Sequence, residues 1–508
     1  MFRKVLIANR GEIALRIMRA CRELGVRTVA VYSEADARAP HVREADEAVL
    51  LGPAPSKESY LKGDAIIAAA LRTGAEAIHP GYGFLSEREW FARAVRDAGL
   101  VWIGPPAEAI AAMGSKTSAR ALAIAAGTPV VPGTTTALRD ATEAAEVAER
   151  FGYPVLLKAA AGGGGKGMRV VHAREDLEGA LASAKREAKN AFGDDAVYVE
   201  KYITGPRHVE IQVLGDSHGT MLHLGERECS VQRRHQKMIE EAPSVAVTPE
   251  LRERMGSAAI AAAKAAGYVN AGTCEFLLDA AGDFYFLEMN TRIQVEHPVT
   301  ELVTGIDLVQ WQLRIAAGER LPFVQSDLTP RGWAIECRIT SEDPSNGFLP
   351  STGRIQYLHV PSGPGVRWDG GIELGSEVSL YYDPMLAKLI VWAPTRIEAV
   401  ERMHRALLEL TIEGVETSRD FHLRVFEDEE FRRGAIEIQW LERRLGDLSN
   451  RTPPPEGVIR AAIAAVLLAE RERTVPRAPA SDPTAGARAD QAPDRGNWLR
   501  AARLDGRR

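Results

Sequence analysis

Two glutamates that flank a predicted hairpin constrain this chain most. Glu275 and Glu288 stand thirteen positions apart, and between them two apolar runs, 276–278 and 284–287, enclose the turn-like segment 279–283. Such a pattern predicts a β-hairpin. Because the turn lies midway, we expect the two carboxylates to face each other, roughly 5 Å apart. Carboxylates this close repel unless they share a proton or bind a cation, and hard oxygen donors suit Mg²⁺ or Mn²⁺.

Polar residues continue beyond this hairpin at every second position. A strand that ran on from Glu288 would place these side chains on one face. The set is Glu288, Asn290, Arg292, Gln294 and Glu296. The pattern therefore predicts a metal site that continues into an anion site. An ordinary solvated strand face is the alternative, which the opposed carboxylates disfavour.

A glycine-rich segment predicts a flap. The apolar run 153–158 ends at Lys158, five glycines fall between 162 and 167, and a second apolar run follows at 168–171. It is not a Walker A motif, because Gly167 rather than Ser or Thr follows Lys166. Glycine N–H groups can approach phosphate oxygens while Lys158 adds positive charge. A flexible hairpin tip is the alternative.

The N-terminus reads as the start of an open α/β domain. Strand-like runs at 4–9 and 28–32 enclose a helical pattern at 12–24. Dinucleotide binding is not expected, since the turn after the first strand contains one glycine. The Gly- and Pro-rich loop 78–87 is typical of either a ligand-binding loop or a tight turn.

Composition sets outer limits on the class of protein. A chain of 508 residues with 45% hydrophobic content is expected to form about three domains. A net charge of −6 gives no basic field for nucleic acid. The four dispersed cysteines favour reduced thiols and a cytoplasmic location. No apolar run reaches the length of a membrane span.

Several segments together resemble known signatures. Lys116, Lys158, the glycine segment, the run 200–203, the facing carboxylates and Asn290 resemble the ATP-grasp superfamily. The segments 207–210, 232–237, 288–298 and 336–338 resemble the signatures of biotin carboxylase. This resemblance extends over about 1–447. It implies an α/β (α+β) ATP-grasp fold with a Rossmann-like N-terminal domain over 1–114, an ATP-grasp domain over 115–315 with a mobile glycine-rich lid at about 131–203, and a C-terminal biotin carboxylase domain over 331–447.

The resemblance also implies roles for individual residues. ATP would contact Lys116, Lys158, Gly164, Gly165, Glu200, Lys201, Ile203 and Leu277. Two Mg²⁺ or Mn²⁺ ions would bind Glu275, Glu288 and Asn290. Bicarbonate would contact Lys237, Arg292, Gln294 and the Val295 N–H, with Glu296 as its base. Arg338 would stabilise the biotin anion, and the biotin and nucleotide cleft would be lined by Tyr82, Gly83, His208, Gln232, His235 and Asp383.

The activity implied is ATP- and bicarbonate-dependent carboxylation of biotin through carboxyphosphate, the first half-reaction of an acyl-CoA carboxylase. Three alternatives stay open: the same subunit of a two-subunit pyruvate carboxylase, a nucleotide-binding regulatory homologue, and an ATP-grasp ligase with another acceptor. By residue type alone, His208 and His235 could be surface residues. Arg338 could equally form a structural ion pair with a neighbouring strand.

The C-terminal residues bear on the partners. The last lysine is Lys388, and no Met-Lys-Met sequence occurs. We therefore expect biotin on a separate biotin carboxyl carrier protein, and a carboxyltransferase subunit would be a further partner. The resemblance also implies a homodimer. The composition of residues 448–508 predicts a partly disordered tail with a helix at about 458–473. This helix and Trp498 could dock a partner. The final carboxyl acceptor has no signal in the sequence.

Overall fold

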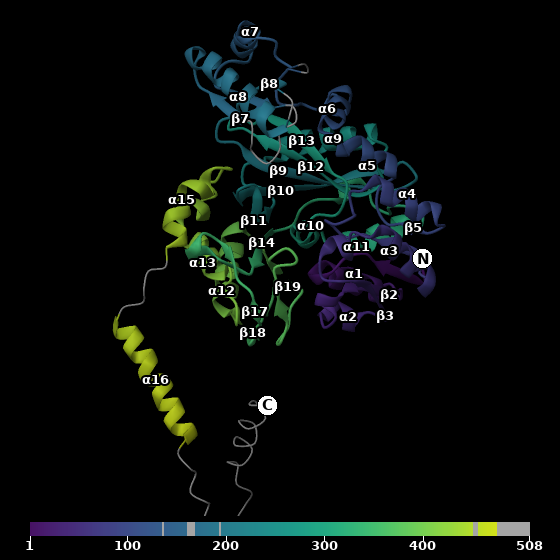
Figure 1. The fold of residues 1–508 in the computed structure, drawn as a ribbon, viewed down its shortest axis with the longest axis vertical. Helices are drawn as coiled ribbons and strands as arrows, with labels where there is room; N and C mark the ends of the chain where they lie inside the picture. The colour runs from purple at the N-terminus through teal and green to yellow at the C-terminus, as the bar shows by residue number, and fades with distance from the viewer. Residues whose placement is uncertain (135–136, 160–167, 193–194, 451–455, 475–508) are drawn as a thin grey trace, which may run out of the picture. The chain divides into compact units, whose positions relative to one another are not determined.

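The N-terminal residues form a parallel sheet covered by helices, as expected for a Rossmann-like start. The computed structural model describes residues 1–134, 137–159, 168–192, 195–450 and 456–474 (Figure 1). The first of these ranges contains a five-stranded parallel sheet with the order β3-β2-β1-β4-β5. Its strands are β1 (Lys4–Ile7), β2 (Arg27–Ser33), β3 (Glu47–Gly52), β4 (Ala77–His79) and β5 (Val101–Trp102). The helices are α1 (Gly11–Glu23), α2 (Pro40–Glu44), α3 (Gly63–Thr73), α4 (Glu89–Asp97) and α5 (Ala107–Gly114).

The glycine segment joins two antiparallel strands, as predicted. β6 (Val155–Ala159) pairs with β7 (Met168–Val171) on one side and with β8 (Val197–Lys201) on the other. The helices α7 (Ala141–Phe151) and α8 (Leu177–Phe192) share a small apolar core with this sheet, and α6 (Lys116–Ala125) precedes them. Gly164 and Gly165 lie outside the described residues.

A second sheet forms the body that carries the hairpin. Among the described residues it has eight strands in the order β13-β12-β9-β10-β11-β14-β21-β19, all antiparallel. These strands are β9 (Arg207–Gly215), β10 (Met221–Arg233), β11 (Gln236–Ala242), β12 (Asn270–Leu278), β13 (Phe284–Asn290), β14 (Trp333–Thr340), β19 (Val366–Gly370) and β21 (Met385–Ala393). The helices of this part of the chain are α9 (Pro249–Ala265), α10 (His297–Thr304) and α11 (Leu308–Ala316).

The predicted hairpin is β12 and β13. Glu275 is the Cα partner of Glu288, which confirms that the two carboxylates are opposed. Behind them, the Phe276 ring makes edge contacts with the rings of Phe284 and Phe286, and this aromatic cluster shares a core with α6 and α9. The period of two along β12 thus anchors one face in the core and leaves the other face for the site.

The C-terminal part continues the same sheet. β11 pairs with β14, so the sheet passes without interruption from the predicted ATP-grasp domain into the predicted C-terminal domain. The domain boundaries inferred from the sequence stay a prediction. The helices here are α12 (Arg396–Glu409), α13 (Arg419–Glu427), α14 (Glu429–Arg432) and α15 (Trp440–Ser449). Three short strand pairs complete this part: β15 (Glu342–Asp343) with β16 (Leu349–Pro350), β17 (Gly353–Arg354) with β20 (Glu377–Val378), and β18 (Tyr357–His359) with β22 (Thr411–Glu413).

The tail forms a separate unit over Arg451–Arg508. Its described part is the helix α16 (Glu456–Thr474), which covers the helix predicted at about 458–473. Trp498 and the stretch predicted to be disordered beyond Thr474 lie outside the described residues. None of the described helices is long and apolar enough to cross a membrane.

Candidate active site

Most of the predicted site residues line one cavity of about 1480 Å³. Residues from the N-terminal part, the flap strands and the eight-stranded sheet contribute to its wall. The predicted residues in the wall are Tyr82, Gly83, Lys158, Glu200, His208, Gln232, His235, Lys237, Glu275, Leu277, Glu288, Asn290, Arg292, Gln294, Val295, Glu296, Arg338 and Asp383. The structure therefore brings together the residues assigned to ATP, metal, bicarbonate and biotin.

Two described residues, Lys201 and Ile203, are not part of this wall, and three predicted residues cannot be placed in it from the described part of the chain. Lys201 turns its ammonium group to the carbonyl oxygen of Gly152 at 2.7 Å, and the Ile203 side chain is buried. The Lys116 side chain is not described, although its backbone begins α6. The remaining two are the flap glycines, Gly164 and Gly165, which lie outside the described residues.

A row of charged side chains crosses four neighbouring strands of the cavity wall. In register, Glu288 on β13 pairs with Glu275 on β12, Glu275 with Glu210 on β9, and Glu210 with Arg227 on β10. Directly paired residues present their side chains on the same face, where like charges destabilise a sheet. Three carboxylates in a row therefore need cations beside them.

Lys237 supplies one of these cations from β11. Its Nζ donates to Glu210 Oε2 at 2.5 Å, to Glu296 Oε1 at 2.6 Å and to Glu275 Oε1 at 3.0 Å. Burial by itself lowers the pKa of Lys237, but the surrounding carboxylates outweigh burial and hold this pKa well above its usual value. Lys237 therefore carries its charge throughout the neutral range.

Arg227 supplies the second cation and is fully buried. Its Nε donates to Glu210, and its Nη2 donates to Gln294 Oε1 at 2.7 Å. Gln294 in turn donates to Glu275 Oε1 at 2.9 Å. Sequence reasoning did not assign Glu210 or Arg227 to the site. The available signal for Glu210 was its position two residues after His208, which puts both on one strand face.

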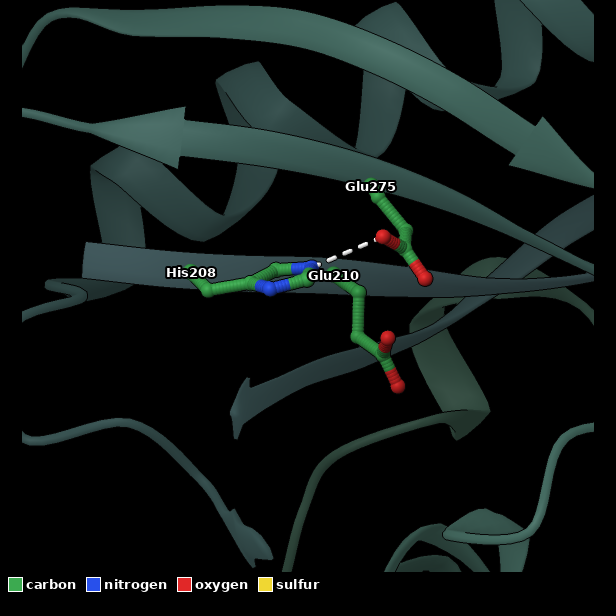
Figure 2. A group of neighbouring side chains, drawn as sticks. All are labelled: His208, Glu210 and Glu275. Atoms are coloured by element: carbon green, nitrogen blue, oxygen red, sulfur yellow. Dashed lines mark ion pairs between the residues drawn. The ribbon is translucent and has the colours of Figure 1, made fainter. Parts of the chain in front are cut away.

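The three side chains drawn in Figure 2 lie close enough to share a metal ion, but one of them, Glu210, already pairs with two cationic side chains. His208, Glu210 and Glu275 offer ligand atoms within 4.8 Å of one another, and His208 Nε2 lies 2.9 Å from Glu275 Oε2 (Figure 2). Glu210, however, is bound by Arg227 and Lys237. A metal ion would have to compete with these two cations for Glu210.

The hairpin fits a divalent ion better. Glu275 and Glu288 offer opposed carboxylates, and Asn290 is adjacent, with its Nδ2 donating to Glu275 Oε1 at 2.8 Å. Carboxylate and amide oxygens are the donors that Mg²⁺ prefers. Burial raises the pKa of Glu275, but Lys237 and His208 outweigh burial and keep this pKa well below its usual range, so its carboxylate is charged.

Glu296 lies between two cations. Its Oε1 accepts from Lys237, and its Oε2 accepts from Arg338 Nη2 at 3.0 Å. Burial raises the pKa of Glu296, yet the neighbouring cations, Lys237 first and Arg338 next, outweigh burial and hold this pKa well below its usual value. Glu296 is therefore ionised and able to accept a proton.

Arg338 is also held by a neighbouring strand. Its Nε donates to Glu240 Oε1 on β11 at 2.6 Å, so the structural ion pair considered from the sequence exists beside the contact with Glu296. Glu240 is the Cα partner of Glu336 on β14, and both carboxyl groups are fully buried. Burial, together with the charge of Glu296, raises the pKa of Glu240 to about 7 against the opposing effect of Arg338.

The strand predicted from Glu288 to Glu296 is wrong beyond Asn290. β13 ends there, and residues 291–296 form bends, irregular backbone and a turn. β12 runs on past Thr273, the partner of Asn290, to Asn270, but the chain does not follow it: the Thr291 N–H donates to Glu87 at 3.2 Å instead. The loop nevertheless delivers to the cavity wall Arg292, Gln294, Val295 and Glu296.

The remaining walls come from the flap and from the N-terminal part. Lys158 on β6 forms an ion pair with Glu200 on β8. Tyr82 donates its hydroxyl to Glu12. His235, which is exposed at the cavity, lies in the tight turn between β10 and β11 with a φ of 65°. His208 is buried rather than on the surface.

Three family profiles match successive parts of the chain. The profile described as biotin carboxylase, N-terminal domain, matches residues 1–110, and that of the carbamoyl-phosphate synthase L chain, ATP binding domain, matches 115–324. The biotin carboxylase C-terminal domain matches 336–443.

Similar proteins cover nearly the same span. One of the subunits of pyruvate carboxylase from Methanothermobacter thermautotrophicus is 54% identical over 443 residues, which are 87% of this chain and 90% of that protein. The biotin carboxylase of Haemophilus influenzae is 54% identical over 447 residues, 88% of this chain and 99% of that protein. A crystal structure of the biotin carboxylase domain of Hydrogenobacter thermophilus 2-oxoglutarate carboxylase, in complex with MgADP, ADP and bicarbonate, superposes with a TM-score of 0.81 at 50% identity, over 89% of this chain and 99% of that chain.

Proposed function

Because this chain belongs to the biotin carboxylase family, we propose that its cavity carries out the ATP- and bicarbonate-dependent carboxylation of biotin with the residues described above. The protein is an ATP-dependent ligase of this family. The observation that carries the residue assignments is the convergence of Lys237, Glu296 and Arg338 beside the opposed carboxylates of the hairpin.

ATP would lie between the flap strands and the hairpin. Lys158 would bind the phosphates after giving up its ion pair with Glu200. Leu277 offers an apolar surface in the same cavity wall. A divalent ion held by Glu275, Glu288 and Asn290 would neutralise charge on the β- and γ-phosphates when bound. The similar crystal structure holds MgADP and bicarbonate, which supports the binding of a magnesium nucleotide as part of the proposal for the present chain.

Bicarbonate would bind where Lys237 and Arg292 provide cations and where Gln294 and the Val295 N–H provide donors. Its negative charge would share the cations that hold the pKa of Glu296 down, so Glu296 becomes a stronger base as the substrate enters. Glu296 then takes the bicarbonate proton, and the resulting oxyanion attacks the γ-phosphorus of ATP. The products are ADP and carboxyphosphate.

Carboxyphosphate breaks down to CO₂ and phosphate within the closed site. The phosphate removes the N1′ proton of biotin, and the ureido anion attacks CO₂ to give carboxybiotin. Arg338 would stabilise that anion, because its guanidinium lines the cavity beside Glu296. Tyr82, Gly83, Gln232, His235 and Asp383 would enclose the biotin ring.

The decisive experiment measures ADP release by the purified chain with and without bicarbonate and free biotin. A biotin carboxylase needs bicarbonate and is stimulated by biotin. ATP binding without ADP release would instead indicate a regulatory homologue. ADP release that depends on bicarbonate but ignores biotin would indicate an ATP-grasp ligase with another acceptor.

The partners we propose are a second copy of this chain, a separate biotin carboxyl carrier protein and a carboxyltransferase subunit. The similar proteins are named for pyruvate and 2-oxoglutarate carboxylases as well as for biotin carboxylase, so the final acceptor stays open. The four cysteines are buried free thiols, which supports a reducing, cytoplasmic compartment as part of the proposal. Identification of co-purifying subunits by mass spectrometry tests the partners and narrows the acceptor.

A further inference from the structure

Lys388 is a buried lysine that neither the sequence motifs nor the proposed mechanism uses. It lies inside β21, and its side chain is completely buried. Its Cα partners on the neighbouring strands are Arg338 on β14 and Asp369 on β19. A buried ammonium group needs close partners, because leaving it unpaired costs several kcal/mol.

The Lys388 ammonium group has two contacts of different kinds. Its Nζ lies 3.1 Å from Glu12 Oε1, which provides a balancing charge from α1. It also donates to the backbone carbonyl oxygen of Val295 at 2.9 Å. Neutralising the charge requires only the first contact. The second contact fixes a peptide group in the loop 291–296.

That peptide group lies directly before Glu296. Its plane sets the direction of the chain into the Glu296 Cα, and α10 begins at the next residue. The carboxylate of Glu296 must reach both Lys237 and Arg338, which it contacts at 2.6 and 3.0 Å. A rotated peptide group would move the carboxylate away from these partners.

Glu12 extends the same chain of contacts to another wall of the cavity. It is buried in the first turn of α1 and accepts the hydroxyl hydrogen of Tyr82, which lines the cavity. A continuous path therefore runs from Tyr82 through Glu12 and Lys388 to Val295. It joins the wall proposed for biotin to the loop proposed for bicarbonate.

We infer that Lys388 is a positioning residue: it holds the Val295 carbonyl so that the loop 291–296 presents the Val295 N–H and the Glu296 carboxylate to bicarbonate, and Glu12 ties it to Tyr82. The catalytic part of this inference rests on the proposed function. The structural part, that Lys388 holds the loop, does not.

Hydrogen exchange and kinetics of the full-length Lys388→Met variant test the two parts separately. Loss of a hydrogen bond from a charged donor should speed amide exchange in the peptide 291–297 by roughly tenfold or more, while exchange in β12 and β13 stays unchanged. In bicarbonate-dependent ADP release, KM for bicarbonate should rise and kcat should fall, each by roughly tenfold, with KM for ATP within about twofold of wild type.

Arg396→Met is the control, because Arg396 is a largely buried cation in the C-terminal part that pairs with Glu241 on β11 and lies outside the cavity wall. It should lower thermal stability without changing exchange in 291–297 or KM for bicarbonate. If Lys388→Met folds poorly, the double variant Lys388→Met with Glu12→Gln removes both buried charges and still lacks the bond to Val295. Lys388→Arg should restore part of the activity.

Unchanged exchange in 291–297 in both Lys388 variants would overturn the inference whether or not the enzyme is active. Faster exchange together with equal rises in KM for bicarbonate and for ATP would overturn the specific link to bicarbonate. A wild-type chain without bicarbonate-dependent ADP release would overturn the proposed function instead. The exchange data would still test whether the contact of Lys388 with the Val295 carbonyl holds the loop.

Discussion

Replacing Glu296 by glutamine tests the proposed base with little change of shape. In the structure Glu296 is nearly fully buried and accepts from Lys237 at 2.6 Å and from Arg338 at 3.0 Å. Glutamine cannot take the bicarbonate proton. General-base catalysis contributes about 10²- to 10⁴-fold, so the variant should lose at least about 10²-fold in bicarbonate-dependent ADP release, or roughly 3 kcal/mol of barrier.

The same substitution should cost little stability. Lys237 keeps Glu210 and Glu275 as partners, and Arg338 keeps Glu240, so neither cation is left unpaired. We expect a loss of about 1–2 kcal/mol in the free energy of unfolding, well below the roughly 3–5 kcal/mol that follows when a buried pair loses its only partner.

The assay measures bicarbonate-dependent ADP release at a saturating concentration of free biotin. The affinity for MgADP is measured separately by calorimetry. The affinity should stay within about twofold, because neither Lys158 nor the hairpin is altered. Glu226→Gln is the control: Glu226 is equally buried and paired with Arg252, but it is not part of the cavity wall, so turnover should persist. Turnover of Glu296→Gln within twofold of wild type would refute the role of Glu296 as the base.

Three further outcomes follow from the geometry. Glu288→Lys should abolish turnover at ordinary Mg²⁺ by placing a cation opposite Glu275, and retained ADP release would exclude the hairpin as the metal site. Burial raises the pKa of Glu240 to about 7, so the folded state keeps a proton that the unfolded state releases at lower pH. The resulting contribution to stability is complete below the ordinary carboxyl pKa. It is lost as the pH rises through about 7. Melting temperatures from pH 5 to 8 should therefore fall less steeply in Glu336→Gln, and equal slopes would contradict an interaction between the two carboxyl groups. The chain should carry no biotin after co-expression with a biotin ligase, since no lysine lies in a Met-Lys-Met sequence and the last lysine, Lys388, is fully buried; a stoichiometric adduct in mass spectrometry would reverse this expectation.

The sequence by itself determined the local elements and the chemistry they carry. Two apolar runs around a turn-like segment were sufficient for β12 and β13, and the runs on both sides of the glycine segment were sufficient for β6 and β7. The motifs around Lys237, Arg292 and Arg338 indicated the right family. These signals are local in the chain, so they can be recognised without knowledge of the fold.

Even the opposed glutamates needed the folded structure to be placed correctly. The turn pairs Leu278 with Phe284 and Phe276 with Phe286, and continued pairing would put Leu287 opposite Glu275. A register shift after Phe276 leaves Leu287 out and brings Glu288 into the pair. An irregularity of this kind depends on packing around the strand and has no periodic signature.

Tertiary structure alone decided which distant side chains meet. Lys237 reaches carboxylates on β9, β12 and the loop before α10, and Lys388 reaches Glu12 across more than three hundred residues of sequence. The segment 291–296 leaves the strand despite its alternating pattern, and the Thr291 N–H donates to Glu87 of the N-terminal part rather than to β12. Periodicity specifies which face of the sheet a side chain occupies. The sheet order β9-β10-β11-β14-β21 specifies which side chains of other strands lie beside it on that face. That order is fixed only when the whole sheet assembles.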